Sequence, residues 1–210
     1  FVPLDEALRI GTSSGFHMIE GNNLWAWPAI YLNMDLAPTD NKDFRDALVK
    51  AFDYNAMVQS FQGKAEVGRG PIPAWFPGSP EKEEPEIKTD LDAAKAALAK
   101  SGLANAKMKC SVPAGFPEFR FAATVLQSSA QQLGVTVEIE EQPFVEAITA
   151  IKSDKSNCFV LGNANLSPSD ATKFFSAHYL KGGFYNSGKF FDQTLQDLVA
   201  KLPTIADATE

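Results

Sequence analysis

The chain has 210 residues, 45% of them hydrophobic, and it carries a net charge of -7 at pH 7. A chain of this size and apolar content can bury a core in one large domain or two small ones. The acidic balance argues against nucleic acid and anionic lipid as partners, because both attract clustered lysine and arginine. No apolar run approaches the roughly 20 residues that cross a bilayer, and no signal peptide precedes Phe1. We therefore expect a soluble chain that is processed or excised from a longer one.

Near the N-terminus, the residues from Gly11 to Gly15 spell GTSSG, the G-x-S-x-G pattern of a nucleophile elbow with Ser13 as the attacking group. Such a serine needs a strand before it and a helix after it. Residues 6–10 are compatible with a short strand, but the glycine, asparagine and proline that follow argue against a helix. His178 is the only candidate base for a triad. A flexible loop is the favoured interpretation, and residues 1–28 are expected to be irregular.

Regular structure is predicted after residue 28. Residues 29–35 predict a strand with Ile30 and Leu32 on one face. Residues 42–53 carry apolar side chains at helical spacing, and Asp53 is predicted to cap a short helix that follows. The apolar stripe of the longer helix consists of Phe44, Ala47, Leu48, Ala51 and Phe52. A proline-rich stretch then predicts an extended loop over residues 68–85.

The second half of the chain is more regular. Asp90 is predicted to cap a helix that ends at Gly102. Residues 107–112 alternate as a strand, residues 118–133 carry the apolar stripe of a helix, and residues 135–140 alternate again. This strand, helix and strand predict two parallel strands with a right-handed connection.

A further helix is predicted over residues 144–153, and residues 157–163 follow with a continuous apolar run that is typical of a central strand covered on both faces. Ligands of open α/β sheets bind beyond the carboxyl ends of such strands. Gly162 lets the backbone approach a ligand closely, and Asn163 and Asn165 supply donors and acceptors. The segment after the strand is therefore the candidate ligand site. The alternative is a loop that caps the next helix through Ser167 or Ser169.

The two cysteines, Cys110 and Cys158, are compatible with one disulfide or with two buried thiols. An oxidised pair can form if they lie on adjacent strands, and two buried thiols are the favoured interpretation. His17 and His178 lack the spacing of a metal motif, so no metal site and no cofactor is expected.

Several motifs together resemble one known family. Residues 31–58, YLNMDLAPTDNKDFRDALVKAFDYNAMV, resemble a segment of the extracytoplasmic solute-binding proteins of the dipeptide and oligopeptide importer family. The family pattern in that segment is l-N, a turn with proline, and v-R-x-A-l-x-x-A-i-D-x-x-x-i-v. The matching positions are Asn33, Pro38, Phe44, Arg45, Ala47, Leu48, Ala51, Phe52, Asp53 and Val58. Residues 68–78 resemble the G-P-i-P loop of the family, residues 91–103 one of its helices, and residues 133–151 its l-G-i-x-v-x-i segment.

The resemblance implies an α/β fold of the periplasmic-binding-protein type (type II), with a mixed, mostly parallel sheet flanked by helices. Members of the family are more than twice as long, and their two lobes close on a ligand. The resemblance implies that residues 29–210 form a single α/β lobe, the discontinuous smaller one. Residues 1–28 would lead in from the missing lobe.

The implied function is that of the substrate-binding component of an ABC importer, which delivers a peptide or a related small solute to an inner-membrane permease. It implies no enzymatic activity, and the acidic charge argues against a nucleic acid partner. Nickel carriage is known in this family and stays an open alternative, because the other lobe is missing. We expect a monomer in the periplasm or elsewhere outside the cytoplasm, with a lipid anchor if the source is Gram-positive.

The candidate ligand segment departs from the family pattern. Peptide-binding members carry G-W-x-x-D after the central strand, and the aspartate meets the α-ammonium group of the peptide. The equivalents here are Gly162, Asn163, Ala164, Asn165 and Leu166. The missing charge-assisted hydrogen bond is worth about 1.5 to 3 kcal/mol. A neutral polar solute such as a sugar, an opine or a blocked peptide is therefore the alternative, unless Asp170 restores the charge.

Other loop residues are candidates for ligand contact. Trp25 and Trp27 either stack on a ligand or pack within the protein. Residues 182–190, GGFYNSGKF, resemble a loop of the family, in which Tyr185 and Asn186 line the cleft or form a turn.

Two other classes of protein are compatible with parts of the sequence. A transcription regulator can carry the same lobe as a sensor, but it would show a DNA-binding domain and basic charge, and neither is evident. A serine hydrolase that acts through Ser13 is the remote alternative.

Overall fold

The structure is a computed structural model, and it describes residues 4–13, 15, 28–70, 87–162, 171–201 and 204. Within these residues, the strands form one sheet in the order β1-β4-β2-β3. The strands are β1 (Pro28–Leu32), β2 (Lys107–Pro113), β3 (Thr136–Gln142) and β4 (Cys158–Gly162). The helices are α1 (Leu4–Gly11), α2 (Lys42–Ala51), α3 (Tyr54–Ser60), α4 (Leu91–Ser101), α5 (Pro117–Gln131), α6 (Phe144–Lys152), α7 (Ala171–Tyr179) and α8 (Gln193–Lys201).

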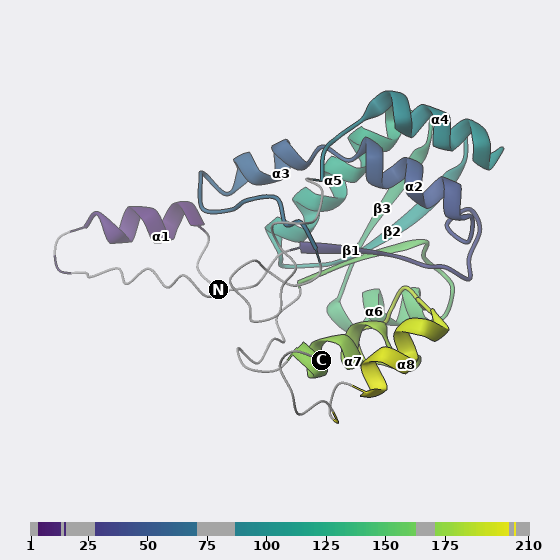
Figure 1. Cartoon of the computed structure of the whole chain (residues 1–210). Coiled ribbons are helices and arrows are strands. Elements are labelled where there is room, and N and C mark those ends of the chain that lie inside the picture. Colours follow the sequence, from purple (N-terminus) through teal and green to yellow (C-terminus); the bar gives the residue numbers. More distant parts are fainter. Residues whose placement is uncertain are drawn as a thin grey trace.

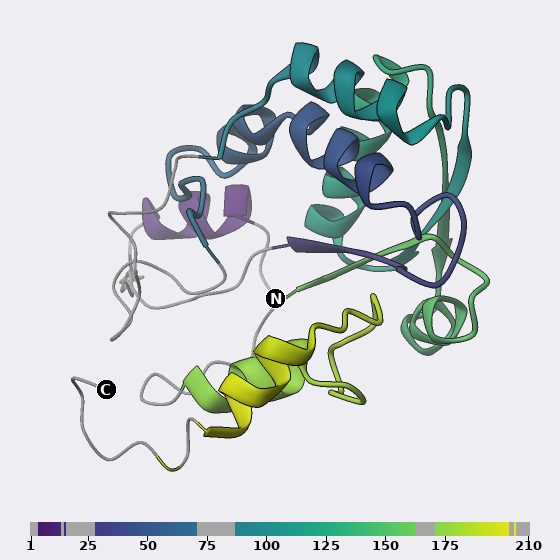
Figure 2. The ribbon, with the colours of Figure 1, turned by 45° about the vertical axis from the view of Figure 1, so that its right-hand side comes forward.

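The sheet is mixed and mostly parallel, as predicted. Strand β2 pairs in parallel with both β3 and β4, and β1 runs antiparallel to β4 at one edge. The predicted parallel unit of strand, helix and strand is confirmed as β2, α5 and β3. Helices α2 to α5 lie on one side of the sheet and α6 to α8 on the other, as Figures 1 and 2 show.

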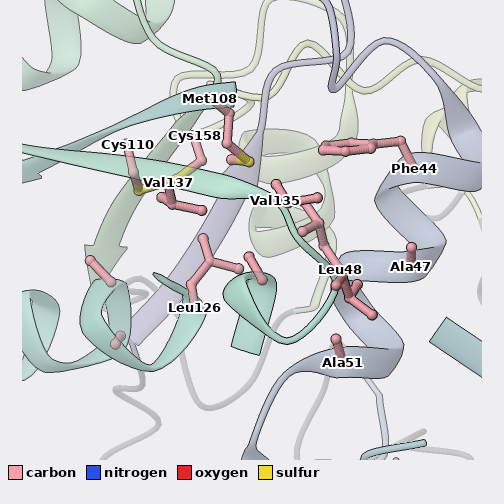
Figure 3. Close-up of a cluster of buried hydrophobic side chains, with 14 of the residues drawn as sticks. Phe44, Ala47, Leu48, Ala51, Met108, Cys110, Leu126, Val135, Val137 and Cys158 are labelled. Atoms are coloured by element: carbon pink, nitrogen blue, oxygen red, sulfur yellow. A yellow bond between two sulfur atoms is a disulfide. The ribbon is translucent and has the colours of Figure 1, made fainter. Parts of the chain in front are cut away.

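The larger core lies between the sheet and the helices α2, α4 and α5 (Figure 3). It contains the stripe that the sequence predicts on α2, where Phe44, Ala47 and Ala51 are fully buried. A smaller core on the other face joins α6 to Phe159 and Leu161 of β4. Because β4 is covered on both faces, its apolar run is continuous, and the prediction of a central strand is confirmed.

Capping residues explain where the helices begin and end. The side chains of Asp53 and Asp90 accept hydrogen bonds from the amides of Ala56 and Ala93, at 3.0 and 2.9 Å, at the starts of α3 and α4. Helix α4 ends at Gly102, whose φ of 72° is the left-handed conformation that glycine adopts without strain. These three sequence predictions are confirmed.

The N-terminal segment corrects one prediction. Residues 6–10, whose sequence is compatible with a short strand within an irregular region, belong instead to helix α1. Glu6 and Arg9 form an ion pair one helical turn apart, which supports a helix. A run this short fits both a strand and a helix, so periodicity alone could not decide.

No helix in the described part of the chain is long and apolar enough to cross a membrane.

The cysteines correct a second prediction. Cys110 and Cys158 form a disulfide, and their Cα atoms are 4.4 Å apart. The two residues face each other in the register of β2 and β4, and the yellow bond in Figure 3 joins them within the larger core. The expectation of two buried thiols was wrong because the sequence does not reveal that β4 lies next to β2.

Candidate functional site

The three parallel strands all end at the same edge of the sheet. β2, β3 and β4 end at Pro113, Gln142 and Gly162, and Pro113 faces Gln142 in the register. Pro28, at the start of β1, pairs with Gly162 at the same edge. We call this the carboxyl edge. Ligands of open α/β sheets bind outside such an edge, which makes it the candidate binding site.

A row of three phenylalanines covers the carboxyl edge. The rings of Phe116 and Phe119 stack with centroids 4.9 Å apart, and the ring of Phe144 lies 6.4 Å from that of Phe116. Phe119 is buried against Gly162, where an added Cβ would lie only 2.8 Å from its Cζ atom. Phe144 is 44% exposed. This aromatic row therefore runs from the buried end of β4 to the surface, and it offers an apolar contact to a ligand.

The charged side chains near this edge lie at the starts of two helices and at the end of β3. Helices α5 and α6 start without a side-chain cap, and each carries a glutamate in its first turn, Glu118 and Glu146. Their carboxylates complement the positive ends of the helix dipoles. Arg120 lies 3.8 Å from Glu141, the residue before the end of β3. The edge thus combines aromatic rings with carboxylates and a guanidinium. Such groups can make apolar contacts and hydrogen bonds with a small molecule.

The two groups named for a hydrolase, Ser13 and His178, each hydrogen bond to another residue. Ser13 follows helix α1, and its hydroxyl donates to the carbonyl of Arg9 at 3.0 Å, as a residue at a helix end does. His178 is buried in α7 and hydrogen bonds with the hydroxyl of Tyr31. Burial lowers the pKa of His178 to about 4. The strand that a nucleophile elbow requires is replaced by a helix, so nothing in this geometry supports the hydrolase alternative.

The structure separates the predicted site residues. Gly162 lies at the carboxyl edge, but Asn186 belongs to a turn after α7 that crosses the other end of β1, where the Gly188 carbonyl accepts from the amide of Met34. The side-chain amide of Asn186 donates to the carbonyls of Leu180 and Phe190. Its amide is therefore used to hold the turn.

Tyr185, in the same turn, packs against the smaller core, and its ring stacks on His178 with centroids 4.9 Å apart. The other predicted contacts lie outside the described residues: Asn163, Asn165, Asp170, Trp25 and Trp27. Within the described part of the chain, no group of three metal-ligating side chains is present.

The aromatic row was missed from the sequence, although a signal was present. Phe116 and Phe144 both come shortly after a strand of the predicted parallel unit and at the start of the next helix. Parallel strands place such positions at the same edge of a sheet. Applying this rule to the strands over 107–112 and 135–140 would have brought the two rings together.

Comparisons with known proteins agree with the fold. Residues 2–186 match the family described as bacterial extracellular solute-binding proteins, family 5 Middle. The chain is 27% identical over 175 residues to the nickel-binding protein NikA of Staphylococcus aureus, an alignment that covers 80% of this chain and 35% of NikA.

Two solved structures show the shared architecture. NikA from Staphylococcus aureus in complex with Ni(L-His)2 superposes with a TM-score of 0.87 at 22% identity, over 99% of this chain and 44% of that one. DppA from Helicobacter pylori in complex with the peptide STSA gives a TM-score of 0.84 at 18% identity, over 98% of this chain and 41% of that one. This chain therefore spans less than half the length of the relatives that it matches.

Proposed function

Because the chain belongs to the family 5 bacterial extracellular solute-binding proteins, we propose that it is one lobe of the substrate-binding component of an ABC importer. In this proposal, residues 29–210 form the lobe, and residues 1–28 lead in from a second lobe. The two lobes close around a small solute and deliver it to the membrane permease. The closed state gains its free energy from burying the solute between them.

The carboxyl edge is the observation that carries this proposal. Gly162 and the exposed ring of Phe144 lie at this edge, and the proposal is supported by the general rule that ligands of open α/β sheets bind outside such an edge. The aromatic row supplies apolar contact, and the proposed polar contacts come from Asn163, Asn165 and Asp170, which follow β4 directly in the sequence. Trp25 and Trp27 remain proposed ligand contacts from the segment before β1.

The disulfide supports a location outside the cytoplasm. Disulfides persist in oxidising compartments and are rare in the cytosol, and the bond between Cys110 and Cys158 is fully buried in the core. We propose that the protein acts as a monomer in the periplasm or at the outer side of the membrane, with a lipid anchor if its source is Gram-positive.

The solute is a peptide or a related small molecule. DppA holds a peptide and NikA a nickel–histidine complex, so both chemistries are candidates within the proposed function. Asn163 and Leu166 stand in the place of the tryptophan and the acid of the family pattern. Without that acid, the amides of Asn163 and Asn165 favour a neutral polar solute such as a sugar, an opine or a blocked peptide.

Native mass spectrometry tests the proposal on the protein purified from its own host without added solute. We expect a bound solute: a ladder of masses for a peptide carrier, or a single mass for a specialised one. For that solute, Phe144→Ala should weaken binding in calorimetry by about tenfold, because a ring contact worth about 1.4 kcal/mol is lost.

Phe191→Ala is the matched control, since Phe191 is 54% exposed and lies outside the aromatic row. Its affinity should stay within about twofold of the wild type. The proposal fails if no solute co-purifies and neither a peptide library, Ni(II) with L-histidine, nor an opine binds. Equal losses in the two variants would remove the carboxyl edge from the site.

A further inference from the structure

His178, near the C-terminal end of α7, lies in a cluster of aromatic rings that comes from three parts of the chain. Its imidazole is nearly parallel to the rings of Tyr31 on β1 and Tyr185 in the turn after α7, at interplanar angles of 14° and 13°. Phe174, one turn earlier on α7, lies 4.4 Å away between ring centroids. The imidazole thus connects α7, which pairs with α8 below the sheet in Figure 2, to an edge strand.

The imidazole of His178 is buried, and one of its two nitrogens has a hydrogen-bond partner. His178 is 5% exposed, and its Nδ1 lies 3.1 Å from the hydroxyl of Tyr31, with which it shares a hydrogen bond. Its Nε2 is buried and has no hydrogen-bond partner in the described part of the chain. Protonation puts a hydrogen on both nitrogens. A proton on this ring would therefore create a buried charged donor without an acceptor, which is costly.

Among the residues that the structure describes, no side chain in contact with the imidazole compensates for such a charge. The titratable groups beside it in this part of the chain are three phenols, Tyr31 on β1, Tyr179 on α7 and Tyr185 in the turn. Burial raises the pKa of Tyr31 and of Tyr179, so both stay neutral at acidic and neutral pH. Helix α8 reaches α7 through the uncharged amide of Gln196, which donates to the carbonyl of Tyr179.

Helix α6 faces the same core with apolar side chains, which are Ala147, Ile148 and Ile151. The cause of the low pKa of His178 is burial alone, which agrees with these uncharged surroundings. Neutral imidazole fits the cluster, and imidazolium does not.

We propose that His178 makes the docking of α7 against β1 sensitive to protons. The neutral ring packs against the two tyrosines and holds α7 on the sheet. The protonated ring leaves the cluster for water, and α7 separates locally from β1 while the larger core on the opposite face remains folded.

The direction follows from the two pKa values of the imidazole. The pKa is about 4 when α7 is docked and returns to an ordinary value near 6.5 when the ring reaches water. Docking is therefore fully stable above about pH 6.5, and it weakens as the pH falls from there toward 4. The equilibrium constant for local opening should rise by up to about tenfold per pH unit in this window.

This inference touches the proposed function at one point. Helix α7 begins at Ala171, nine residues after the carboxyl end of β4 at Gly162, and the residues between them include the proposed polar contacts. If the proposed function holds, local opening of α7 would loosen one side of the solute site. The test below needs no solute, so it can fail or succeed independently of the importer assignment.

Hydrogen–deuterium exchange of the full chain between pH 7 and pH 4.5, corrected for the intrinsic exchange rate, measures the opening of α7. We expect peptides that cover α7 to lose protection by at least about tenfold over this range, while peptides from α2 and α5 keep theirs. His178→Phe keeps a ring of similar shape without a titrating nitrogen. It should abolish the loss in α7.

Two matched variants separate the proton effect from lost packing. Tyr31→Phe removes the hydroxyl partner but keeps the titrating imidazole, and His17→Gln removes the other histidine. Both should retain the loss of protection on acidification. An equally steep loss in His178→Phe, or no loss in the wild type, overturns the proposal.

A measurement on the wild type covers the case in which His178→Phe does not fold. The imidazole proton of His178, followed by NMR, should titrate over the same pH range in which α7 loses protection. If the imidazole titrates near 6.5 while α7 stays protected, the ring is not coupled to docking and the proposal is wrong.

Discussion

At the scale of single residues, Gly162 shows how the absence of a side chain shapes the candidate site. Its backbone does not need the left-handed conformation, so the requirement for glycine is one of space. The ring of Phe119 occupies the volume that a Cβ would fill. This close packing allows the aromatic row to begin directly beneath the end of β4.

The variant Gly162→Ala tests this packing. The added methyl group should force the ring of Phe119 to move and lower the free energy of unfolding by about 1 to 3 kcal/mol, as measured by urea denaturation. In a Phe119→Leu background, Gly162→Ala should lower the free energy of unfolding much less, because leucine lacks the Cζ atom that the added methyl group meets.

Gly70→Ala is the control for adding a methyl group, since no atom of the described residues lies within 4 Å of its would-be Cβ. Its effect should stay within about 0.5 kcal/mol. If Gly162→Ala is equally neutral, the contact with Phe119 does not restrict this position.

At the scale of elements, helix α4 shows how local sequence signals set the bounds of a helix. Helix α4 begins at a carboxylate that caps its first turn, ends at a glycine, and buries Ala94, Ala97 and Leu98 at helical spacing. All of these signals lie within one short stretch of sequence. The predicted helix therefore agrees closely with the observed one.

Removing the cap should weaken α4 measurably. Asp90→Ala leaves the amide of Ala93 without its partner and should lower the free energy of unfolding by about 1 kcal/mol. Asp90→Asn keeps an acceptor oxygen and should retain most of the stability. If the alanine and asparagine variants unfold at the same urea concentration, the side chain does not act as a cap.

At the scale of the whole molecule, the disulfide ties the two halves of the parallel sheet together. Cys110 and Cys158 are separated by 48 residues, and the chain between them contains α5, β3 and α6. A crosslink that closes a loop of this length lowers the entropy of the unfolded chain. The bond therefore stabilises the sheet at its centre, away from the carboxyl edge.

Replacing both cysteines by alanine should lower the free energy of unfolding by about 4 kcal/mol, the loop-entropy value for this separation. Wild-type protein in a strong thiol reductant should approach the same stability, whereas the double variant should not respond to the reductant. A loss below about 1 kcal/mol in the variant would show that the crosslink contributes little.

The candidate site was predictable only in part. Gly162 could be placed at the end of a buried strand because a continuous apolar run marks such a strand wherever it lies in the sheet. The role of the neighbouring rings was not evident, because Phe116, Phe119 and Phe144 read as ordinary apolar residues until the sheet places them at one edge. Asn186 read as a ligand candidate, yet its amide is used within its own turn.

The sequence by itself determined the α/β class, the parallel unit of β2, α5 and β3, the caps of α3 and α4, and the family. Each of these depends on residues close together in the chain or on motifs in a fixed order. Only the tertiary structure decided that β4 lies between β1 and β2. That order pairs Cys110 with Cys158 and sets Tyr31 against His178, contacts between residues far apart in the chain. Such pairings depend on how strands with similar apolar patterns arrange themselves, and no local signal encodes that arrangement.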